Sequence, residues 1–221
     1  MATEIGMQVN GEKTQMLCIH PCIHNRVNTH IINNNARIKS GENMKILGFT
    51  FDSRPNANCH VERLIERFYS RLWTLRFLKR SGLKQDALLA IYNCVLRSAV
   101  EYCSAVYHSM IPGILAEKLE KIQRQALKII YGWDEDIGRI MEVKGIETLE
   151  ERREKKVLSF ALKNEEKERF GKKWFKKSLE THREVREGTR SKYRMPLCRT
   201  ERMKNNPVTY MTKILNEHYG T

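Results

Sequence analysis

The sequence predicts a mainly α-helical protein with a small antiparallel β region at its N-terminus, an α+β class. Short apolar runs separated by Asn-rich and Gly-containing turns fill the first 54 residues. Beyond residue 60, apolar residues recur at spacings of three and four, the period of a helix with one buried face. A length of 221 residues and a hydrophobic share of 41% suffice for one sizeable core or two small ones.

The β region is expected to contain short strands within residues 13–20, 27–32 and 36–39. A turn is expected at 33–35, because Asn tolerates left-handed backbone, and a second turn at 40–43. Residues 44–51 predict one further strand with Gly48 inside it. A glycine within a strand marks either a bulge or the close approach of another backbone.

Four helices are predicted, over residues 60–80, 85–107, 115–131 and 148–163. Ser81-Gly82 and Gly132 are expected to end the first and third, and Thr148 with Glu151 has the spacing of a capping box. A last amphipathic helix is expected over 208–218, after a basic and irregular stretch. The expected core positions are Leu64, Phe68, Leu72, Leu75, Leu88, Ile91, Tyr92, Val95, Leu96, Ala99, Leu119, Ile122, Ala126 and Ile129.

Charge is the strongest compositional feature. Lys and Arg number 40 against 26 acidic residues, which gives a net charge of +14. From Glu151 to Thr221 there are 20 basic and 10 acidic residues, so this segment carries +10. Such an excess favours a polyanionic partner, since neutralised phosphates release counterions. Nucleic acid, an acidic membrane surface and simple solubility all remain compatible with it.

The chain is expected to be intracellular, nuclear or cytoplasmic, with no membrane partner. It has no apolar run of about 18 residues and no basic start followed by an apolar stretch. Its six cysteines are irregularly spaced, which favours reduced thiols. The cluster Cys18, His20, Cys22 and His24 lacks the second ligand pair at regular spacing that zinc sites show, so we expect no metal there.

Two rows of cations are candidates for phosphate contact. Arg63, Arg67 and Arg71 follow one face of the first predicted helix, beside its apolar stripe. A second row on the third helix consists of Lys121, Arg124 and Lys128. Either row could equally be a solvated basic face. Trp174-Phe175, flanked by lysine pairs, could stack on single strands or be the buried side of a helix.

Short segments spread over nearly the whole chain form a known order. They are 6–14 (GMQVNGEKT), 45–52 (KILGFTFD), His60-Val61, 101–107 (EYCSAVY), 119–127 (LEKIQRQAL), 149–153 (LEERR), 193–200 (YRMPLCRT), 206–208 (NPV) and 215–216 (LN). In this order they resemble the C-terminal part of LINE- or jockey-like non-LTR retrotransposon reverse transcriptases. The resemblance implies a palm remnant over 1–54, a helical thumb over 55–132 and a basic post-thumb tail over 133–221.

The resemblance also implies a function. A thumb holds the template–primer duplex of RNA and DNA, and the resemblance places Lys13, Lys45 and Gly48 beside nucleic acid, Gly48 at a primer-grip position. The missing palm and fingers of a full-length RNA-directed DNA polymerase would then be a further partner. The alternative is a free-standing helical module, domesticated or decayed, that binds nucleic acid or serves as a scaffold.

No catalytic residue or metal ligand is expected in this chain. The family holds its metal ions with an early palm Asp and with Y-x-D-D, both of which would precede residue 6. Tyr131-Gly132-Trp133-Asp134 has no adjacent Asp pair and ends a predicted helix. We therefore expect no cofactor here, with Mg²⁺ needed only in a complete enzyme, and no polymerase activity from this chain alone.

Overall fold

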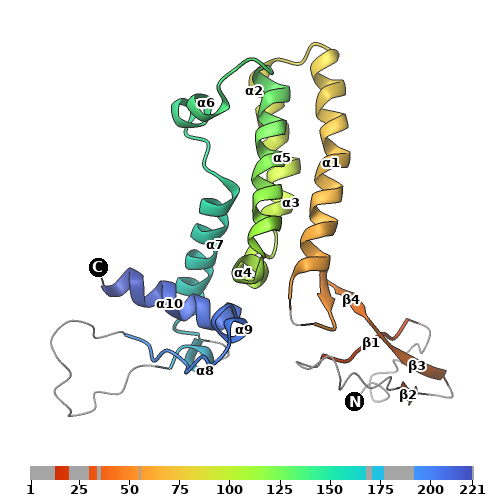
Figure 1. Ribbon diagram of the computed structural model, residues 1–221, viewed down its shortest axis with the longest axis vertical. Coiled ribbons are helices and arrows are strands. Elements are labelled where there is room, and N and C mark those ends of the chain that lie inside the picture. Colours follow the sequence, from red (N-terminus) through yellow and green to blue (C-terminus); the bar gives the residue numbers. More distant parts are fainter. Residues whose placement is uncertain are drawn as a thin grey trace. The chain divides into compact units, whose positions relative to one another are not determined.

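The computed structural model describes residues 13–19, 30–33, 36–54, 56–167, 171–176 and 192–220 (Figure 1). These residues are mainly helical, with a small β region near the N-terminus, which confirms the α+β class. The chain forms two compact units, residues 1–63 and 64–221, whose boundary falls inside the first long helix. None of the helices in the described ranges is long and apolar enough to cross a membrane.

Three short strands make the first sheet. β2 (His30–Asn33) pairs antiparallel with β3 (Ala36–Gly41), which confirms the predicted return of the chain after residue 33. β1 (Met16–Leu17) pairs with β3 in parallel, so the sheet is mixed rather than wholly antiparallel. The chain between β1 and β3 is long enough for the crossover connection that a parallel pair requires.

β4 (Asn43–Ile46) and β5 (Phe49–Asp52) form a hairpin, so the prediction of one strand over 44–51 is wrong. The chain reverses at Leu47 and Gly48, whose φ angles are 49° and 87°. Two consecutive positive φ angles characterise a two-residue type I′ turn, for which glycine at the second position is favoured. Gly48 is therefore a turn residue.

α1 (Asn58–Arg80) begins directly after this hairpin. In its first turn, the Nδ1 atom of His60 accepts a hydrogen bond of 3.3 Å from the backbone N–H of Thr50 in β5. The His60 ring also packs on Phe49, with ring centroids 4.3 Å apart. Further along α1, the predicted apolar stripe is buried, and the helix ends at Ser81-Gly82 as expected. Its members are Leu64, Phe68, Leu72 and Leu75.

The predicted single helix over 85–107 is wrong in two respects. α2 (Gln85–Ile91) continues as a π-helical turn, η3 (Tyr92–Arg97), and then as α3 (Ser98–Glu101). The wider turn shifts the buried face, so Val95 is exposed. Cys103 then adopts a positive φ of 56° and separates α3 from the short α4 (Ser104–Tyr107) and the 3-10 turn η4 (His108–Met110).

α5 (Gly113–Tyr131) confirms the third predicted helix, with its four predicted core residues buried and Gly132 at its C-terminus. α7 (Leu149–Asn164) confirms the fourth, and Thr148 and Glu151 form both hydrogen bonds of the predicted capping box. Between them lies α6 (Ile137–Lys144), which the sequence reasoning missed. Figure 1 shows α2 beside α5, and α7 following α6 along the chain.

The C-terminal part contains α8 (Gly171–Trp174), α9 (Glu201–Lys204) and α10 (Pro207–Gly220). α10 confirms the last predicted helix and packs on α7. Phe175 is buried between these elements, so this aromatic belongs to the packing rather than to the surface. The small core here consists of Val157, Ala161, Phe175, Tyr193, Met211, Ile214 and Leu215.

Candidate nucleic-acid interface

Two of the resembling segments, 119–127 and 149–153, meet at the start of α7. The Glu120 carboxylate accepts hydrogen bonds from the backbone N–H groups of Leu149, at 3.2 Å, and of Glu150, at 2.9 Å. Gln123 accepts from Leu149 at 3.2 Å and donates to the carbonyl of Glu147 at 2.9 Å. A carboxylate is well placed there, because the first N–H groups of a helix have no partner within it.

Segment 101–107 joins the same region through Glu101, whose side chain is buried at the end of α3. Its carboxylate lies 3.3 Å from Arg97 Nε and 2.7 Å from Lys156 Nζ, and it also pairs with Arg152. Burial opposes ionisation, but the bonds from Arg152 and Lys156 hold the pKa of Glu101 below its ordinary value. Glu101 is therefore a carboxylate at neutral pH and fastens α3 to α7.

Arg153 of the same segment is almost fully buried, and its Nη2 lies 3.8 Å from Glu120 Oε1. We call these residues, Glu101, Glu120, Gln123, Arg152 and Arg153, the α5–α7 junction. They contact neighbouring helices and Glu147 in the loop before α7, while Nε and Nη1 of Arg153 are buried without a hydrogen bond from the part of the chain that the structure describes. The residues of the junction therefore stabilise the packing of the helices. This structural role accounts for the charged and polar side chains at these positions.

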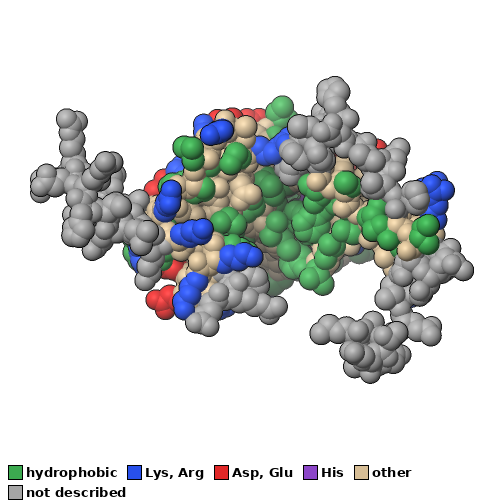
Figure 2. Space-filling model, turned by 90° about the horizontal axis from the view of Figure 1, so that it is seen from below, with side chains coloured by type: hydrophobic (Ala, Val, Ile, Leu, Met, Phe, Trp, Pro, Cys, Tyr) green, Lys and Arg blue, Asp and Glu red, His purple; other side chains and the backbone are tan. Residues whose placement is uncertain are grey.

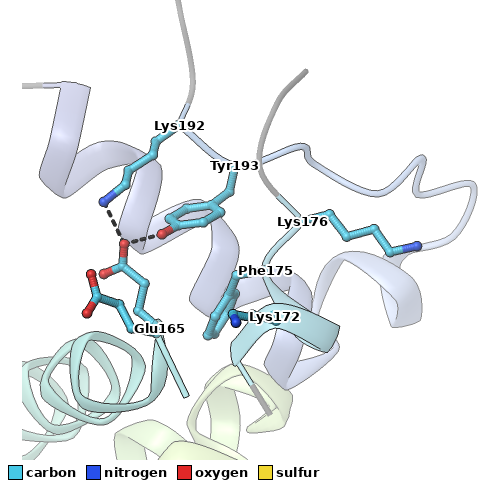
Figure 3. Close-up of a pocket in the computed structure, with 7 residues that line it drawn as sticks. Glu165, Lys172, Phe175, Lys176, Lys192 and Tyr193 are labelled. Atoms are coloured by element: carbon cyan, nitrogen blue, oxygen red, sulfur yellow. Dashed lines mark hydrogen bonds and ion pairs between the residues drawn. The ribbon is translucent and has the colours of Figure 1, made fainter. Parts of the chain in front are cut away.

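The C-terminal segments are fastened by a second carboxylate, Glu165 (Figure 3). Lys192 Nζ lies 2.6 Å from Glu165 Oε1, and Tyr193 donates its hydroxyl to the same oxygen. Tyr219 donates to Glu165 Oε2 at 2.8 Å. We call Glu165, Lys192, Tyr193 and Tyr219 the Glu165 centre. Burial opposes its ionisation, yet these three partners hold the pKa of Glu165 below its ordinary value.

An open hollow of about 470 Å³ adjoins the Glu165 centre. Phe175, Lys172 and Lys176 line it together with residues of the Glu165 centre, and Figure 3 shows the Lys176 side chain pointing away from Glu165. Burial and the nearby Glu165 carboxylate raise the pKa of Tyr193 to about 12, so its hydroxyl stays protonated and keeps donating. Asn216 holds the Tyr193 backbone with two hydrogen bonds of 2.8 and 2.9 Å. The centre is therefore a structural clasp between α7 and the C-terminal segments.

The arginine row on α1 is largely engaged by the protein. Arg63 donates to Thr50 Oγ1 at 3.0 Å and to Asn43 Oδ1 at 3.4 Å. Arg71 donates to the carbonyl of Val95, in the π-helical turn, at 2.7 Å. Arg67 is exposed, and within the described residues its guanidinium has no such bond. The three residues are therefore not one uniform row of available cations.

The row on α5 is more open. Lys121 and Arg124 are exposed on the side of α5 that faces away from Leu119 and Ile122. Lys128 is half-buried, and its Nζ lies 5.8 Å from the ring centroid of Trp133. Lys121 and Arg124 can therefore contact a phosphate without losing a protein partner.

The candidates in the N-terminal unit lie at separate places. Lys13 is exposed before β1, Lys45 is exposed on β4, and Gly48 lies at the turn of the hairpin. Of the Cys/His cluster, only Cys18 is described, and residues 20–24 lie outside the described residues. Across the described ranges, no three His, Cys, Asp or Glu side chains gather in a way that could hold a metal ion.

Basic side chains also cover the C-terminal part. Figure 2 shows Lys and Arg side chains spread over the side of the molecule where α8, α9 and α10 lie. Many are exposed, although some have acidic partners, such as Lys204 with Glu201 at 2.6 Å. The exposed residues are Lys172, Lys173, Lys176, Lys192, Arg194, Arg199, Arg202, Lys204 and Lys213.

Sequence reasoning missed one surface feature, a row of exposed aromatic side chains on α1. Tyr69, Trp73 and Phe77 follow each other at intervals of four residues on the side away from the buried leucines. This spacing was a signal that could have revealed them.

No family model matches the chain, and neither a curated protein nor a solved structure matches it significantly.

Proposed function

We propose that this chain is the template–primer-holding part of a non-LTR retrotransposon reverse transcriptase. In that role it grips the duplex of RNA and DNA mainly through phosphates and contributes to RNA-directed DNA synthesis within a complete enzyme. The observation that carries the proposal is the order of the resembling segments, from Gly6 to Asn216. Any one of these segments alone would be weak support, but their shared order along one chain is specific to this family.

Several of the resembling segments lie in contact inside the helical unit. Segments 101–107, 119–127 and 149–153 meet at the α5–α7 junction, and segments 193–200 and 215–216 meet through Tyr193 and Asn216. Neighbouring helices of one folded unit make such contacts in any case, so the proposal rests on the order of the segments along the chain.

The cations that remain open supply the binding chemistry. Arg67, Lys121 and Arg124 are exposed in a chain with a net charge of +14. Guanidinium and ammonium groups contact phosphate oxygens of any sequence, which suits a protein that must hold whatever duplex is being copied. Such contacts fix position and register and leave base identity to pairing within the duplex.

Binding of a fluorescent RNA–DNA hybrid, followed by anisotropy at several salt concentrations, tests the proposal. Lys121→Glu combined with Arg124→Glu should weaken binding at least about tenfold and reduce the salt slope by about 2, because two phosphate contacts are lost. Arg67→Glu alone should weaken it less. The matched control is Lys163→Glu with Lys167→Glu on exposed positions of and just after α7, which makes the same change in net charge.

Equal losses in both double variants would show that only total charge matters and would contradict the proposed contacts. Absence of salt-sensitive binding by the unaltered chain would contradict the function itself. With Mg²⁺ and deoxynucleotides, this chain alone should extend no primer, since it contains no adjacent Asp pair. A reading frame that joins Met1 to an upstream Y-x-D-D segment supports the polymerase, whereas its absence supports the free-standing module.

A further inference from the structure

One side of α1 carries large aromatic rings that the fold leaves uncovered. Trp73 is 65% exposed, Phe77 is 54% exposed and Tyr69 is 45% exposed. The Trp73 and Phe77 rings are stacked, with centroids 5.7 Å apart and planes 13° from parallel. Uncovered aromatic surface of this size is costly in water, so a row of such rings marks an interaction site.

Trp133, just after α5, is 60% exposed and shares a hollow with Arg76, which lies three residues beyond Trp73 on α1. This open hollow has a volume of about 530 Å³, and its wall includes Ile129 of α5. Three cations from the last turns of α1 line the same hollow, and Lys128 approaches the Trp133 ring from α5. The three cations are Arg76, Lys79 and Arg80.

The cations that line the hollow, Arg76, Lys79 and Arg80, have no acidic residue between them and Trp73. Glu66 and Asp86 are the nearest acidic residues in the sequence on either side of α1's last turns. Acidic residues 134–136 follow Trp133 but do not line the hollow. Rings and cations therefore alternate on one surface, which we call the aromatic face: Tyr69, Trp73, Arg76, Phe77, Arg80 and Trp133.

On α1, the aromatic residues lie on a different side from Arg67, the cation of this helix that the proposed function uses. At about 100° per residue, Trp73 lies roughly 120° around α1 from Arg67. The two residues therefore point to different sides of the helix. A duplex hides its bases inside, so flat rings gain little from it, whereas an unpaired base exposes a π-face on which an aromatic ring can stack.

We propose that the aromatic face binds single-stranded nucleic acid, with unpaired bases stacked on Trp73, Phe77 and Trp133 and phosphates paired with Arg76, Lys79 and Arg80. This inference rests on the proposed nucleic-acid function and adds a second substrate class, the unpaired strand. Charge complementarity favours a polyanion over an apolar partner, and the stacked rings favour one that carries bases.

The test measures binding of the full chain to a fluorescent dT strand of about 12 nucleotides, to an abasic strand of equal length and to a blunt RNA–DNA hybrid. Trp73→Ala with Phe77→Ala should weaken dT binding at least about tenfold and leave hybrid binding within about twofold. The matched control, Phe160→Ala, removes an exposed aromatic of α7 and should change neither. The abasic strand should bind weakly to all three proteins.

A spectroscopic measurement keeps the test valid if the double variant folds poorly. The chain has three tryptophans, so Trp133→Phe with Trp174→Phe leaves Trp73 as the single emitter and preserves a ring at each position. Saturation with the dT strand should quench its fluorescence, because a stacked base lies against the indole. No quenching at saturation would overturn the inference.

Three further results would also overturn it. They are equal weakening of dT and hybrid binding in the Trp73/Phe77 variant, abasic binding as tight as dT binding, and competition by polyglutamate as strong as competition by dT. Each result would show that the chain binds these ligands through charge alone, without stacking on bases. Failure of the proposed function is separate, because it appears as the absence of salt-sensitive hybrid binding by the unaltered chain.

Discussion

The α5–α7 junction and the Glu165 centre both place a carboxylate among cationic or hydroxyl donors, yet they hold different parts of the molecule. The junction joins α3, α5 and α7 within the helical packing, through guanidinium groups and backbone N–H groups. The Glu165 centre fastens segments beyond residue 192 to the end of α7, through one ammonium and two phenol groups. Loss of the junction should therefore weaken the whole helical unit, and loss of the Glu165 centre only its C-terminal part.

The largest effect is expected at the junction. Glu101→Ala should lower the free energy of unfolding by about 2–3 kcal/mol, because Arg152, Lys156 and Arg97 would lose a buried anion. Urea denaturation measures this change. Glu117→Ala, at an exposed position of α5, is the matched control and should cost less than about 0.5 kcal/mol. Similar losses of stability in the two variants would show that Glu101 contributes no more than an exposed residue and would contradict the structural role of the junction.

A smaller and more local effect is expected at the Glu165 centre. Glu165→Ala should cost about 1–2 kcal/mol, because three hydrogen bonds to one carboxylate are lost at the edge of the unit. Amide hydrogen exchange should accelerate in α10 and stay unchanged in α5. If α5 also lost protection, the two carboxylates would support one cooperative unit, and the contrast between them would be wrong.

The dependence of stability on pH should distinguish the carboxylates of the two regions from a third titrating group, His108. Burial, with the nearby Arg153 charge, lowers the pKa of His108 to about 4 from an ordinary 6.5. As the pH falls, His108 is protonated in the unfolded chain before it is protonated in the folded chain. The free energy of unfolding should therefore fall as the pH drops from about 6.5 to about 4. Glu101 and Glu165, whose pKa values are lowered, keep their contribution above the ordinary 4.5 and lose it at lower pH.

Unfolding free energies measured between pH 7 and pH 3 test this order. His108→Gln should flatten the limb between 6.5 and 4 and preserve the loss at lower pH. Glu165→Ala should do the reverse, with a diminished loss only below the ordinary pKa of 4.5. An unchanged upper limb in His108→Gln would show that another group titrates there.

The sequence predicted regular helices well, from a repeat of apolar residues in α1, α5 and α10 and from a capping box in α7. It failed where the backbone departs from regular geometry. The π-helical turn after Ile91 shifts the buried face away from Val95, and the extended Tyr102 and left-handed Cys103 separate α3 from α4. The spacing of apolar residues indicates neither feature. α6 was missed because it is short, although Asp136 caps it and Gly145 ends it.

For the candidate site, spacing identified which side of a helix a cation occupies but not whether the protein already uses it. Arg67 and Arg71 are one turn apart and equivalent by sequence pattern. Only the structure shows that the widened turn at Val95 presents a carbonyl to Arg71. The exposed aromatic row had a readable spacing, but only the burial of the leucines on the other side shows that Tyr69, Trp73 and Phe77 face water.

The smallest expected effect distinguishes these two arginines. Arg71→Ala should cost about 0.5–1 kcal/mol of stability, because an exposed hydrogen bond of 2.7 Å to the Val95 carbonyl is lost. Arg67→Ala should cost less than about 0.5 kcal/mol, since its side chain is exposed. Hybrid binding should show the opposite order, with the larger loss in Arg67→Ala. Equal stability and equal binding in the two variants would mean that the carbonyl at the π-helical turn does not compete with phosphate for Arg71, and that the row functions as the uniform surface that its spacing suggests.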